Sequence, residues 1–302
     1  MAGVHKPTSR RQLASQGKTA AARPVTALAA AGVRPAKSRG QNFLVSPSVA
    51  DRIVAAADLS PSDDVIEIGP GLGILTERIV ISPIRGVTLI ELDSRLAERL
   101  AEKFAWDAAV RVVNEDFLHA DLNEIAGGAP VKVIGNLPFN SAAAMLHKLC
   151  GHSRSIARMV LMFQREVAAR IRARPNCESY GALSVFTALY WEIDLHFVVA
   201  AGSFHPRPKV DAEVIRFRPR TTQLYAPDEE PAVLATVRAA FSAPRKTIRN
   251  ALAVATGLDA GKISAALGRA GIDPSVRAET LEPARFVALA RAFGGAVGTR
   301  DA

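Results

Sequence analysis

Glycines and polar side chains stand at four places where an apolar run of this 302-residue sequence ends. The first is G-P-G-L-G, Gly69 to Gly73, where glycines let the backbone approach a ligand closely and a following helix would offer free N–H groups. The fingerprint for dinucleotides requires a further glycine at the position that Ile74 occupies. The loop therefore favours a nucleoside cofactor without a pyrophosphate.

Two carboxylates follow at the ends of the next two apolar runs. Glu91 comes 22 residues after Gly69, where a carboxylate can accept hydrogen bonds from both hydroxyls of a ribose. Asp116, in N-E-D-F, can accept a hydrogen bond from the exocyclic amine of an adenine. With the loop, these acids suit the adenosine of S-adenosylmethionine (SAM). In the alternative interpretation the glycines only turn the chain and the acids cap helices.

The fourth place is V-I-G-N-L-P-F-N, where an apolar run ends in an amide, a proline and an aromatic ring. The exocyclic amine of a base is a poor nucleophile because its lone pair is delocalised. In Asn136-Leu137-Pro138-Phe139, the amide oxygen and a neighbouring backbone carbonyl can accept hydrogen bonds from both N–H groups of such an amine. These two bonds would direct the lone pair of the amine at a methyl donor. Pro138 would hold that carbonyl, and Phe139 would stack on a base swung out of its helix or loop. Alone, the tetrapeptide could equally be a strand-end turn.

The elements that must position these groups alternate between strands and helices. Apolar periodicity, caps and glycines predict strands over 64–68, 87–92, 110–114 and 131–135, helices over 46–57, 74–80, 94–104, 142–149 and 165–172, and a late strand in E-V-I-R-F-R-P. This alternation predicts an α/β fold over 37–221, with a doubly wound, mostly parallel, Rossmann-like sheet. Periodic segments over 228–255, 261–270 and 283–293 predict a small all-helical C-terminal domain over 222–302.

Positive charge is concentrated at the N-terminus. Residues 1–40 hold eight basic residues and no acidic residue, which leaves 30 basic against 29 acidic residues in the rest. We expect a disordered basic arm over 1–36, and it could bind nucleic-acid phosphates or serve as an organellar transit peptide. Cys150 and Cys177 are too few for a disulfide framework or a zinc site, and no apolar run approaches a membrane span of roughly 20 residues. A cytoplasmic protein without a metal is expected.

Six motifs follow one another from Lys37 to the C-terminal region. They are K-S-R-G-Q-N-F-L, V-I-E-I-G-P-G-L-G, G-N-L-P-F-N, Y-G-A-L-S-V, F-H-P-R-P-K-V-D and R-K-T-I-R-N-A-L. In this order they resemble the KsgA-type ribosomal RNA small-subunit adenine dimethyltransferases. Each motif is modest support by itself, whereas six in the family's order are strong support, and the region that they span includes nearly all of the chain except the arm.

The resemblance implies a SAM-dependent methyltransferase domain that dimethylates N6 of two adjacent adenosines in the 3′-terminal hairpin of small-subunit rRNA. It implies that the protein is a monomer and that it binds small-subunit rRNA within the immature small ribosomal subunit. Phe139 stands where the family most often has tyrosine, so stacking is kept and any contact through a phenolic hydroxyl is absent. Gln41 would help to close the pocket. The implied cofactor contacts are Asn42, Leu44, Gly69, Glu91, Asp116 and Asn136, the last of which also faces the target amine.

Basic residues predict where RNA phosphates would bind, although arginine clusters are also common on solvated faces. R-K-T-I-R-N-A-L is expected to place its three basic residues on one helix. The candidates are Arg165, Arg172, Lys209, Arg245, Lys246 and Arg249.

Three rival functions stay open. One is a large-subunit rRNA methyltransferase of the macrolide-resistance type. Two features favour the small-subunit family instead: the R-K-T-I-R-N-A-L motif, and N-L-P in place of N-I-P. Another is a non-catalytic ribosome-assembly or transcription factor on the same fold, which intact Glu91, Asp116 and Asn136 argue against. The third is a nicotinamide dehydrogenase, but this sequence lacks the third glycine of the dinucleotide fingerprint.

Overall fold

The structure, a computed structural model, describes residues 9–16 and 42–294. The chain divides into two compact units, Met1–Ala168 with Ile193–Pro219 and Ala169–Glu192 with Arg220–Ala302. The predicted boundary at residue 221 lies close to one junction of these units. It assigns Ala169–Glu192 to the sheet domain, however, whereas the structure groups this segment with the C-terminal helices.

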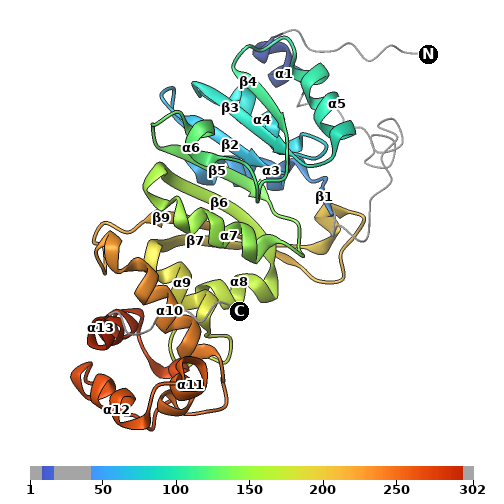
Figure 1. The fold of residues 1–302 in the computed structure, drawn as a ribbon. Coiled ribbons are helices and arrows are strands. Elements are labelled where there is room, and N and C mark those ends of the chain that lie inside the picture. Colours follow the sequence, from blue (N-terminus) through green and yellow to red (C-terminus); the bar gives the residue numbers. More distant parts are fainter. Residues whose placement is uncertain (1–8, 17–41, 295–302) are drawn as a thin grey trace. The chain divides into compact units, whose positions relative to one another are not determined.

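A seven-stranded sheet forms the first unit (Figure 1). Its strands are β2 (Asp64–Ile68), β3 (Gly86–Glu91), β4 (Val110–Asn114), β5 (Val131–Asn136), β6 (Ile156–Gln164), β7 (Trp191–Val199) and β9 (Ala212–Pro219). The order is β4-β3-β2-β5-β6-β9-β7, in which β2 to β6 pair in parallel and β9 pairs antiparallel to β6. The predicted doubly wound, mostly parallel fold is confirmed. A separate two-stranded sheet joins β1 (Phe43–Leu44) to β8 (Phe204–His205).

Helices cover both faces of the large sheet, because right-handed crossovers change face where the strand order reverses (Figure 1). The helices α3 (Pro47–Ala57), α4 (Ile74–Ile81) and α5 (Ser94–Phe104) lie on one side, and α6 (Leu122–Ala126) and α7 (Ala142–Gly151) on the other. Caps set several of their starts. The Asp93 side chain accepts the N–H of Arg95 at the start of α5, and Pro47 occupies the first turn of α3.

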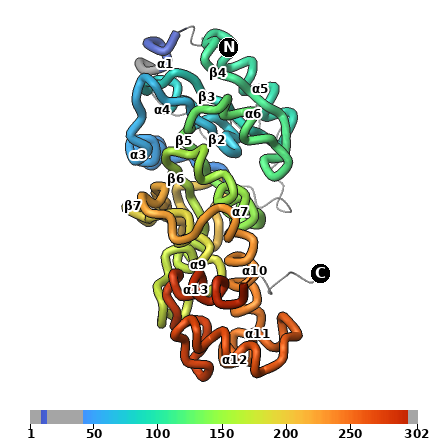
Figure 2. Tube along the Cα trace, turned by 60° about the vertical axis from the view of Figure 1, so that its left-hand side comes forward, coloured from blue at the N-terminus to red at the C-terminus, as the bar shows by residue number. Residues whose placement is uncertain are grey.

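Helices form the second unit (Figure 2). They are α9 (Ala182–Tyr190), α10 (Glu230–Phe241), α11 (Ile248–Thr256), α12 (Ala260–Arg269) and α13 (Pro283–Phe293), while α8 (Arg165–Arg172) crosses the junction of the units. In this unit α10 packs against both α11 and α13, and α12 also joins those two helices. Because α9 contacts both α10 and α13, its segment belongs to this unit. Aromatic side chains help to hold the unit together, and the ring centroids of partly buried Phe241 and fully buried Phe286 lie 5.6 Å apart.

Three cations from the sheet meet the C-terminus of α3. Arg158 donates to the carbonyl oxygen of Ala57 at 3.2 Å, Arg216 donates to that of Ala56 at 3.3 Å, and Lys132 donates to that of Asp58. The last carbonyls of a helix have no partner within the helix and carry partial negative charge. These contacts therefore anchor α3 against β5, β6 and β9.

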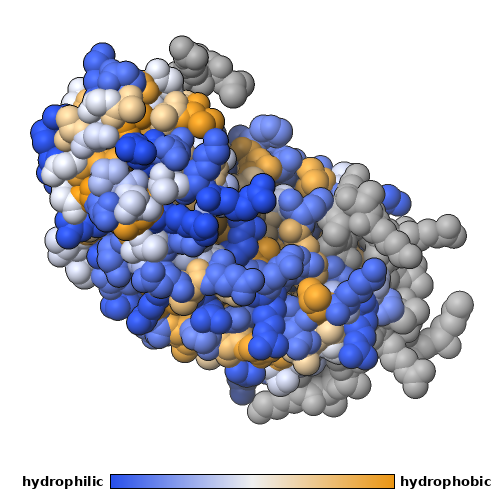
Figure 3. Space-filling view, turned by 90° about the horizontal axis from the view of Figure 1, so that it is seen from below, coloured by the Kyte–Doolittle hydropathy of each residue, from blue (hydrophilic) through white to orange (hydrophobic). Residues whose placement is uncertain are grey.

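Hydrophilic side chains cover much of the face drawn in Figure 3, with smaller apolar areas between them. Large apolar side chains that are exposed within the described ranges come from separate elements: Ile81, Leu92, Val198, Val210 and Val254. None of the helices in residues 9–16 and 42–294 is long and apolar enough to cross a membrane.

A buried carboxyl group joins β2 to α4. Glu67 is 1% exposed, and its Oε2 accepts a hydrogen bond from the Thr76 hydroxyl at 2.7 Å. Within the part of the chain that the structure describes, Oε1 has no hydrogen-bond partner. Burial, with a smaller contribution from the charge of Glu91, raises the pKa of Glu67 to about 8. The carboxyl group is therefore mostly protonated at neutral pH.

This raised pKa predicts a pH-dependent difference between the wild type and Glu67→Gln. Between the ordinary pKa of 4.5 and about 8, the folded chain keeps a proton that the unfolded chain releases. The contribution of Glu67 to stability is thus greatest at low pH and is lost as pH rises to about 8. Relative to the glutamine variant, the wild-type free energy of unfolding should fall by on the order of 1 kcal/mol per pH unit. Urea denaturation at several pH values across this window measures the free energy of unfolding of both proteins. A difference between them that does not change with pH would contradict the raised pKa of Glu67.

A helix stands within the segment predicted to be disordered. α1 (Arg10–Gln16) contacts α4, Leu13 is 7% exposed within the main apolar core, and Nε of Arg10 lies 2.7 Å from Oδ2 of Asp107. The prediction of disorder is therefore wrong for these residues, because an apolar anchor and an ion pair fix a helix too short to be stable alone. The rest of the predicted arm, residues 1–8 and 17–36, lies outside the described residues.

Leu13→Ala should lower the free energy of unfolding by about 2 kcal/mol, because it leaves a cavity where α1 meets α4. Arg11→Ala is the matched control, since Arg11 is exposed on the same helix and should change stability by less than about 0.5 kcal/mol. Chemical denaturation of both variants provides the measurement. Equal stabilities of the two variants would show that α1 does not dock.

Candidate functional site

Three strands deliver the predicted residues to one edge of the sheet. Ile68 of β2 lies opposite Ile90 of β3 and Gly135 of β5, so the residues that follow reach the same carboxyl edge. A cavity of about 60 Å³ lies there, lined by Asn42, Phe43, Gly69, Gly71, Glu91, Asn136, Leu137, Pro138 and Phe139. Seven of these nine residues were predicted from the sequence as catalytic or cofactor-binding.

The glycine loop has a backbone that other residues rarely adopt. Gly69, Gly71 and Gly73 all have positive φ, between 56° and 80°. A Cβ atom on Gly71 would lie 2.9 Å from a ring carbon of Phe43. Glycine is therefore required at position 71 both for the left-handed turn and for the close approach of Phe43.

Phe43 is the lining residue that the sequence did not single out. It is 8% exposed and packs in a small apolar cluster with Leu96 and the partly buried Leu72. The signal was present in Q-N-F-L as an apolar residue between two predicted cofactor contacts. Its position over the glycine turn depends on the pairing of β1 with β8, which no local pattern reveals.

Main-chain donors hold the Glu91 carboxylate in place. Oε2 accepts the Gly71 N–H and Oε1 accepts the Asp93 N–H, both at 3.0 Å. Glu91 is 5% exposed, and burial raises its pKa against the opposing effect of these two donors. Each oxygen thus accepts one of these two N–H groups and can also accept a hydrogen bond from a ligand.

The amide of Asn136 is oriented by the segment that precedes β1. Its Nδ2 donates to the carbonyl oxygen of Asn42 at 3.0 Å, which leaves Oδ1 as the acceptor atom of the group. Leu137 is 1% exposed, and its N–H donates to the Met162 carbonyl oxygen at 3.3 Å. Pro138 and Phe139 are half-buried at the cavity wall.

Two predicted cofactor contacts do not line this cavity. Leu44 is 4% exposed in the core and pairs with Phe204. Asp116 follows β4, and its Oδ1 accepts the Leu118 N–H at 2.9 Å in a tight turn. Oδ2 lies 3.9 Å from Nδ1 of His119, and the Asp116 side chain is 33% exposed. A third predicted residue, Gln41, lies outside the described residues.

All six basic residues predicted to contact RNA are exposed: Arg165, Arg172, Lys209, Arg245, Lys246 and Arg249. The expectation that the last three share one helix is wrong. Thr247 is the N-cap of α11, so Arg245 and Lys246 precede the helix in a turn in which the Lys246 N–H donates to the Ala243 carbonyl oxygen. Extended backbone at Thr247 separates these two residues from Arg249.

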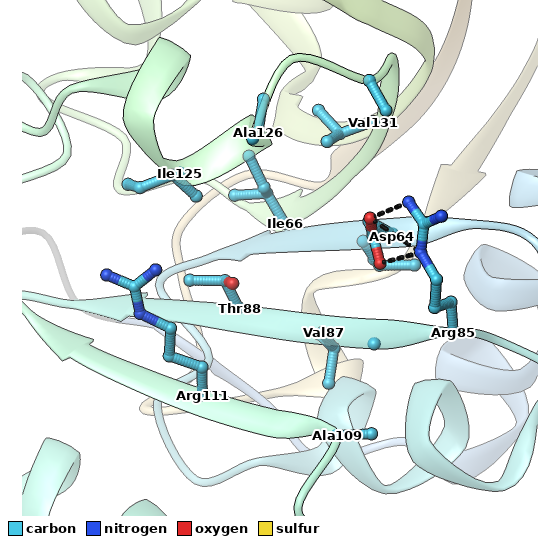
Figure 4. Close-up of a pocket in the computed structure, with 14 residues that line it drawn as sticks. Asp64, Ile66, Arg85, Val87, Thr88, Ala109, Arg111, Ile125, Ala126 and Val131 are labelled. Atoms are coloured by element: carbon cyan, nitrogen blue, oxygen red, sulfur yellow. Dashed lines mark hydrogen bonds and ion pairs between the residues drawn. The ribbon is translucent and has the colours of Figure 1, made fainter.

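A larger cavity, of about 250 Å³, lies at the opposite, amino ends of the same strands (Figure 4). Apolar residues such as Ile66, Ala126 and Val131 line it, with Arg111 on one side and Arg85 on the other. Nε of Arg85 lies 3.0 Å from both carboxylate oxygens of Asp64. None of the predicted site residues lines it. Because open α/β sheets bind ligands at the carboxyl ends of their strands, the smaller cavity is the candidate site.

The sequence and the fold match one group of known proteins. A family model described as ribosomal RNA adenine dimethylase matches residues 34–293. Ribosomal RNA small subunit methyltransferase A of Geobacter metallireducens is 40% identical over 266 residues, covering 87% of this chain and 96% of that protein. The protein of the same name from Xanthomonas campestris is 37% identical over 254 residues, covering 84% and 94%.

Solved structures of two methyl transferases share the fold. A dimethyladenosine transferase from Plasmodium falciparum has a TM-score of 0.72 at 23% identity, covering 84% of this chain and 98% of that one. The 23S rRNA methyltransferase ErmE has a TM-score of 0.62 at 28% identity, covering 84% and 100%. The family model and the relative that is 40% identical show that the chain belongs to the ribosomal RNA adenine dimethylase family.

Proposed function

We propose that the chain transfers methyl groups from SAM to N6 of two adjacent adenosines in the 3′-terminal hairpin of small-subunit rRNA. The observation that carries this proposal is the Asn136 amide, fixed by the Asn42 carbonyl in a cavity that the glycine loop and Glu91 also line. Support for the small-subunit substrate comes from relatives named for it that align over almost their whole length.

The residues at this edge fit the adenosine of SAM. Gly69, Glu91 and Asn136 would contact the cofactor, and Glu91 would accept hydrogen bonds from both ribose hydroxyls through its remaining lone pairs. Asn42 and Leu44 would also contact the cofactor, and Asp116 would accept the adenine amine through Oδ2. When bound, SAM supplies an electrophilic methyl group on a sulfonium, and no metal is required for its transfer.

Four consecutive residues would hold the target base. The two N–H groups of the adenosine amine donate hydrogen bonds to Asn136 Oδ1 and to a neighbouring main-chain carbonyl, of Leu137 or Pro138. These bonds direct the lone pair of the amine toward the methyl group. Pro138 restricts that backbone. Phe139 stacks on the base through its ring face, which needs no phenolic hydroxyl. The amine becomes acidic as it is methylated, so solvent can take the proton.

The proposed substrate is an immature small ribosomal subunit bound by a monomer in the cytoplasm. Support comes from the six exposed basic residues, which can contact RNA phosphates in both units. Because the chain would bind the subunit late in its assembly, it would also act as a checkpoint of that assembly.

Two other functions of the same fold remain to be tested. Large-subunit methylation has one specific observation in its favour, the 28% identity to ErmE across the whole of that chain. A non-catalytic assembly factor would bind the subunit without turnover. Incubating the chain with labelled SAM and small subunits from a methylation-deficient strain, beside protein-free 23S rRNA, separates all three. Dimethyladenosine in the small subunit alone supports the proposal, whereas label only in 23S rRNA, or binding without product, overturns it.

Asn136→Ala should lower the rate of methyl transfer at least about 100-fold, because the oriented acceptor for the amine is lost. Binding of the small subunit should change less than about twofold, since the contacts with phosphates remain. Asn140→Ala is the control, because Asn140 is exposed in the same turn. Single-turnover rates and filter binding measure the two effects. Near-normal turnover of the Asn136 variant would refute the role of the amide.

Gly71→Ala should weaken the binding of S-adenosylhomocysteine at least about tenfold, through backbone strain of about 1–2 kcal/mol and the clash with Phe43. Gly127→Ala is a matched control, since Gly127 also has positive φ but a Cβ there would meet nothing within 4 Å. Phe43→Ala in the Gly71→Ala background should recover part of the affinity. Isothermal titration calorimetry gives the values, and equal affinities for both alanine variants would exclude a specific effect of the loop.

A further inference from the structure

One lysine connects helix α7 to the loop that follows β4. Lys148 lies in the last turn of α7, and its Nζ donates to the carbonyl oxygens of Phe117 at 2.8 Å, Leu118 at 3.0 Å and Ala120 at 2.5 Å. All three carbonyls belong to the loop between β4 and α6. A single ammonium group thus uses its three N–H donors on one stretch of backbone.

That stretch contains the turn built on Asp116. Asp116 Oδ1 accepts the Leu118 N–H, while the Asp116 carbonyl oxygen accepts the N–H groups of His119 at 2.8 Å and Ala120 at 3.0 Å. The Lys148 ammonium also lies 5.4 Å from the centroid of the Phe117 ring, and Phe117 is 3% exposed. The turn that carries Asp116 is therefore held by Lys148 as well as by its own hydrogen bonds.

The helix that carries Lys148 continues directly from the motif proposed to hold the target base. Ser141 is the N-cap of α7, and its N–H donates to the Pro138 carbonyl oxygen at 3.2 Å. Buried Met145, Leu146 and Leu149 seat the helix in the core. The position of the Asp116 loop is consequently set relative to Asn136–Phe139 rather than by the short turn alone.

We propose that Lys148 is a positioning residue that holds the Asp116 carboxylate where it selects the exocyclic amine of the cofactor's adenine. The proposal rests on the proposed function, in which Asp116 accepts that amine. Without the three N–H donors, the loop keeps its own turn but loses its fixed distance from α7. Selection of adenine should then weaken, while contacts with the ribose through Glu91 persist.

Lys148→Met tests this, because methionine keeps an unbranched side chain and removes all three donors. The ligands are S-adenosylhomocysteine and S-inosylhomocysteine, which differ only in the purine. The inosine compound has a carbonyl oxygen where the adenosine compound has the exocyclic amine. In the wild type, the amine should be preferred by about tenfold, since a carboxylate accepts from an amine and repels a carbonyl oxygen. Lys148→Met should reduce this preference to less than about threefold and should raise KM for SAM with little change in kcat.

Lys132→Met is the matched control. Lys132 also donates to a main-chain carbonyl, that of Asp58, and lies 2.8 Å from Asp63 Oδ2, but it stands at the amino end of β5. It should lower thermal stability without changing the preference for adenine. A merely structural role for Lys148 would make the two variants alike, with the preference intact in both, and would overturn the proposal.

The remaining outcomes separate this proposal from the proposed function. A wild type that does not bind S-adenosylhomocysteine overturns the cofactor assignment and the Lys148 proposal together. Wild-type binding without preference for the amine overturns the assignment of Asp116 together with the role of Lys148, but leaves the contacts of Gly69, Glu91 and Asn136 with the cofactor standing. The same preference in wild type and Lys148→Met overturns only the role of Lys148. If Lys148→Met fails to fold, Lys148→Arg replaces it, because a planar guanidinium keeps the charge but cannot converge on three carbonyls in the same way. An intermediate preference is then expected, and an unchanged one counts against the proposal.

Discussion

The candidate site depends on the parallel register of β2, β3 and β5. Because Ile68 lies opposite both Ile90 and Gly135, the residues that follow on all three strands reach one edge together. The backbones approach closely at this pair, since a Cβ on Gly135 would lie 3.0 Å from the Ile68 carbonyl oxygen, so the pairing favours glycine at position 135. A slip of one residue would turn the side chains of a strand to the opposite face and remove its acceptor from the site.

Main-chain groups, rather than paired side-chain charges, hold the polar side chains at this edge. Two N–H groups bind the Glu91 carboxylate, the Asn42 carbonyl orients the Asn136 amide, and three carbonyls surround the Lys148 ammonium. Such partners move only when the backbone moves, so they fix the acceptor atoms before a ligand arrives. Glu67, two residues before Gly69 on β2, is kept mostly neutral by burial and adds little negative charge to the site.

Much of the fold followed from local patterns, and the failures have identifiable physical causes. The predicted bounds of α5, α8, α13 and β4 agree with the structure, because caps, prolines and periodicity mark their ends. β6 was not predicted, since a run such as I-A-R-M-V-L-M-F-Q is apolar on both faces and has no diagnostic period. α1 was missed because Leu13 and the Arg10–Asp107 pair stabilise it only through distant elements. Asp228 to Ala255 was read as one helical segment, whereas the cap at Thr247 begins a second helix.

The sequence by itself determined which chemical groups are present and in what order: the glycine loop, the two acids and the motif from Asn136 to Phe139. Each lies at the end of a strand, and parallel strands bring such ends to one edge. Only the tertiary structure decided that Phe43 packs over Gly71, that Asn42 orients Asn136 and that Lys148 holds the Asp116 loop. These contacts join residues about 30 to 94 positions apart, and no local pattern encodes them because they depend on how separate elements pack.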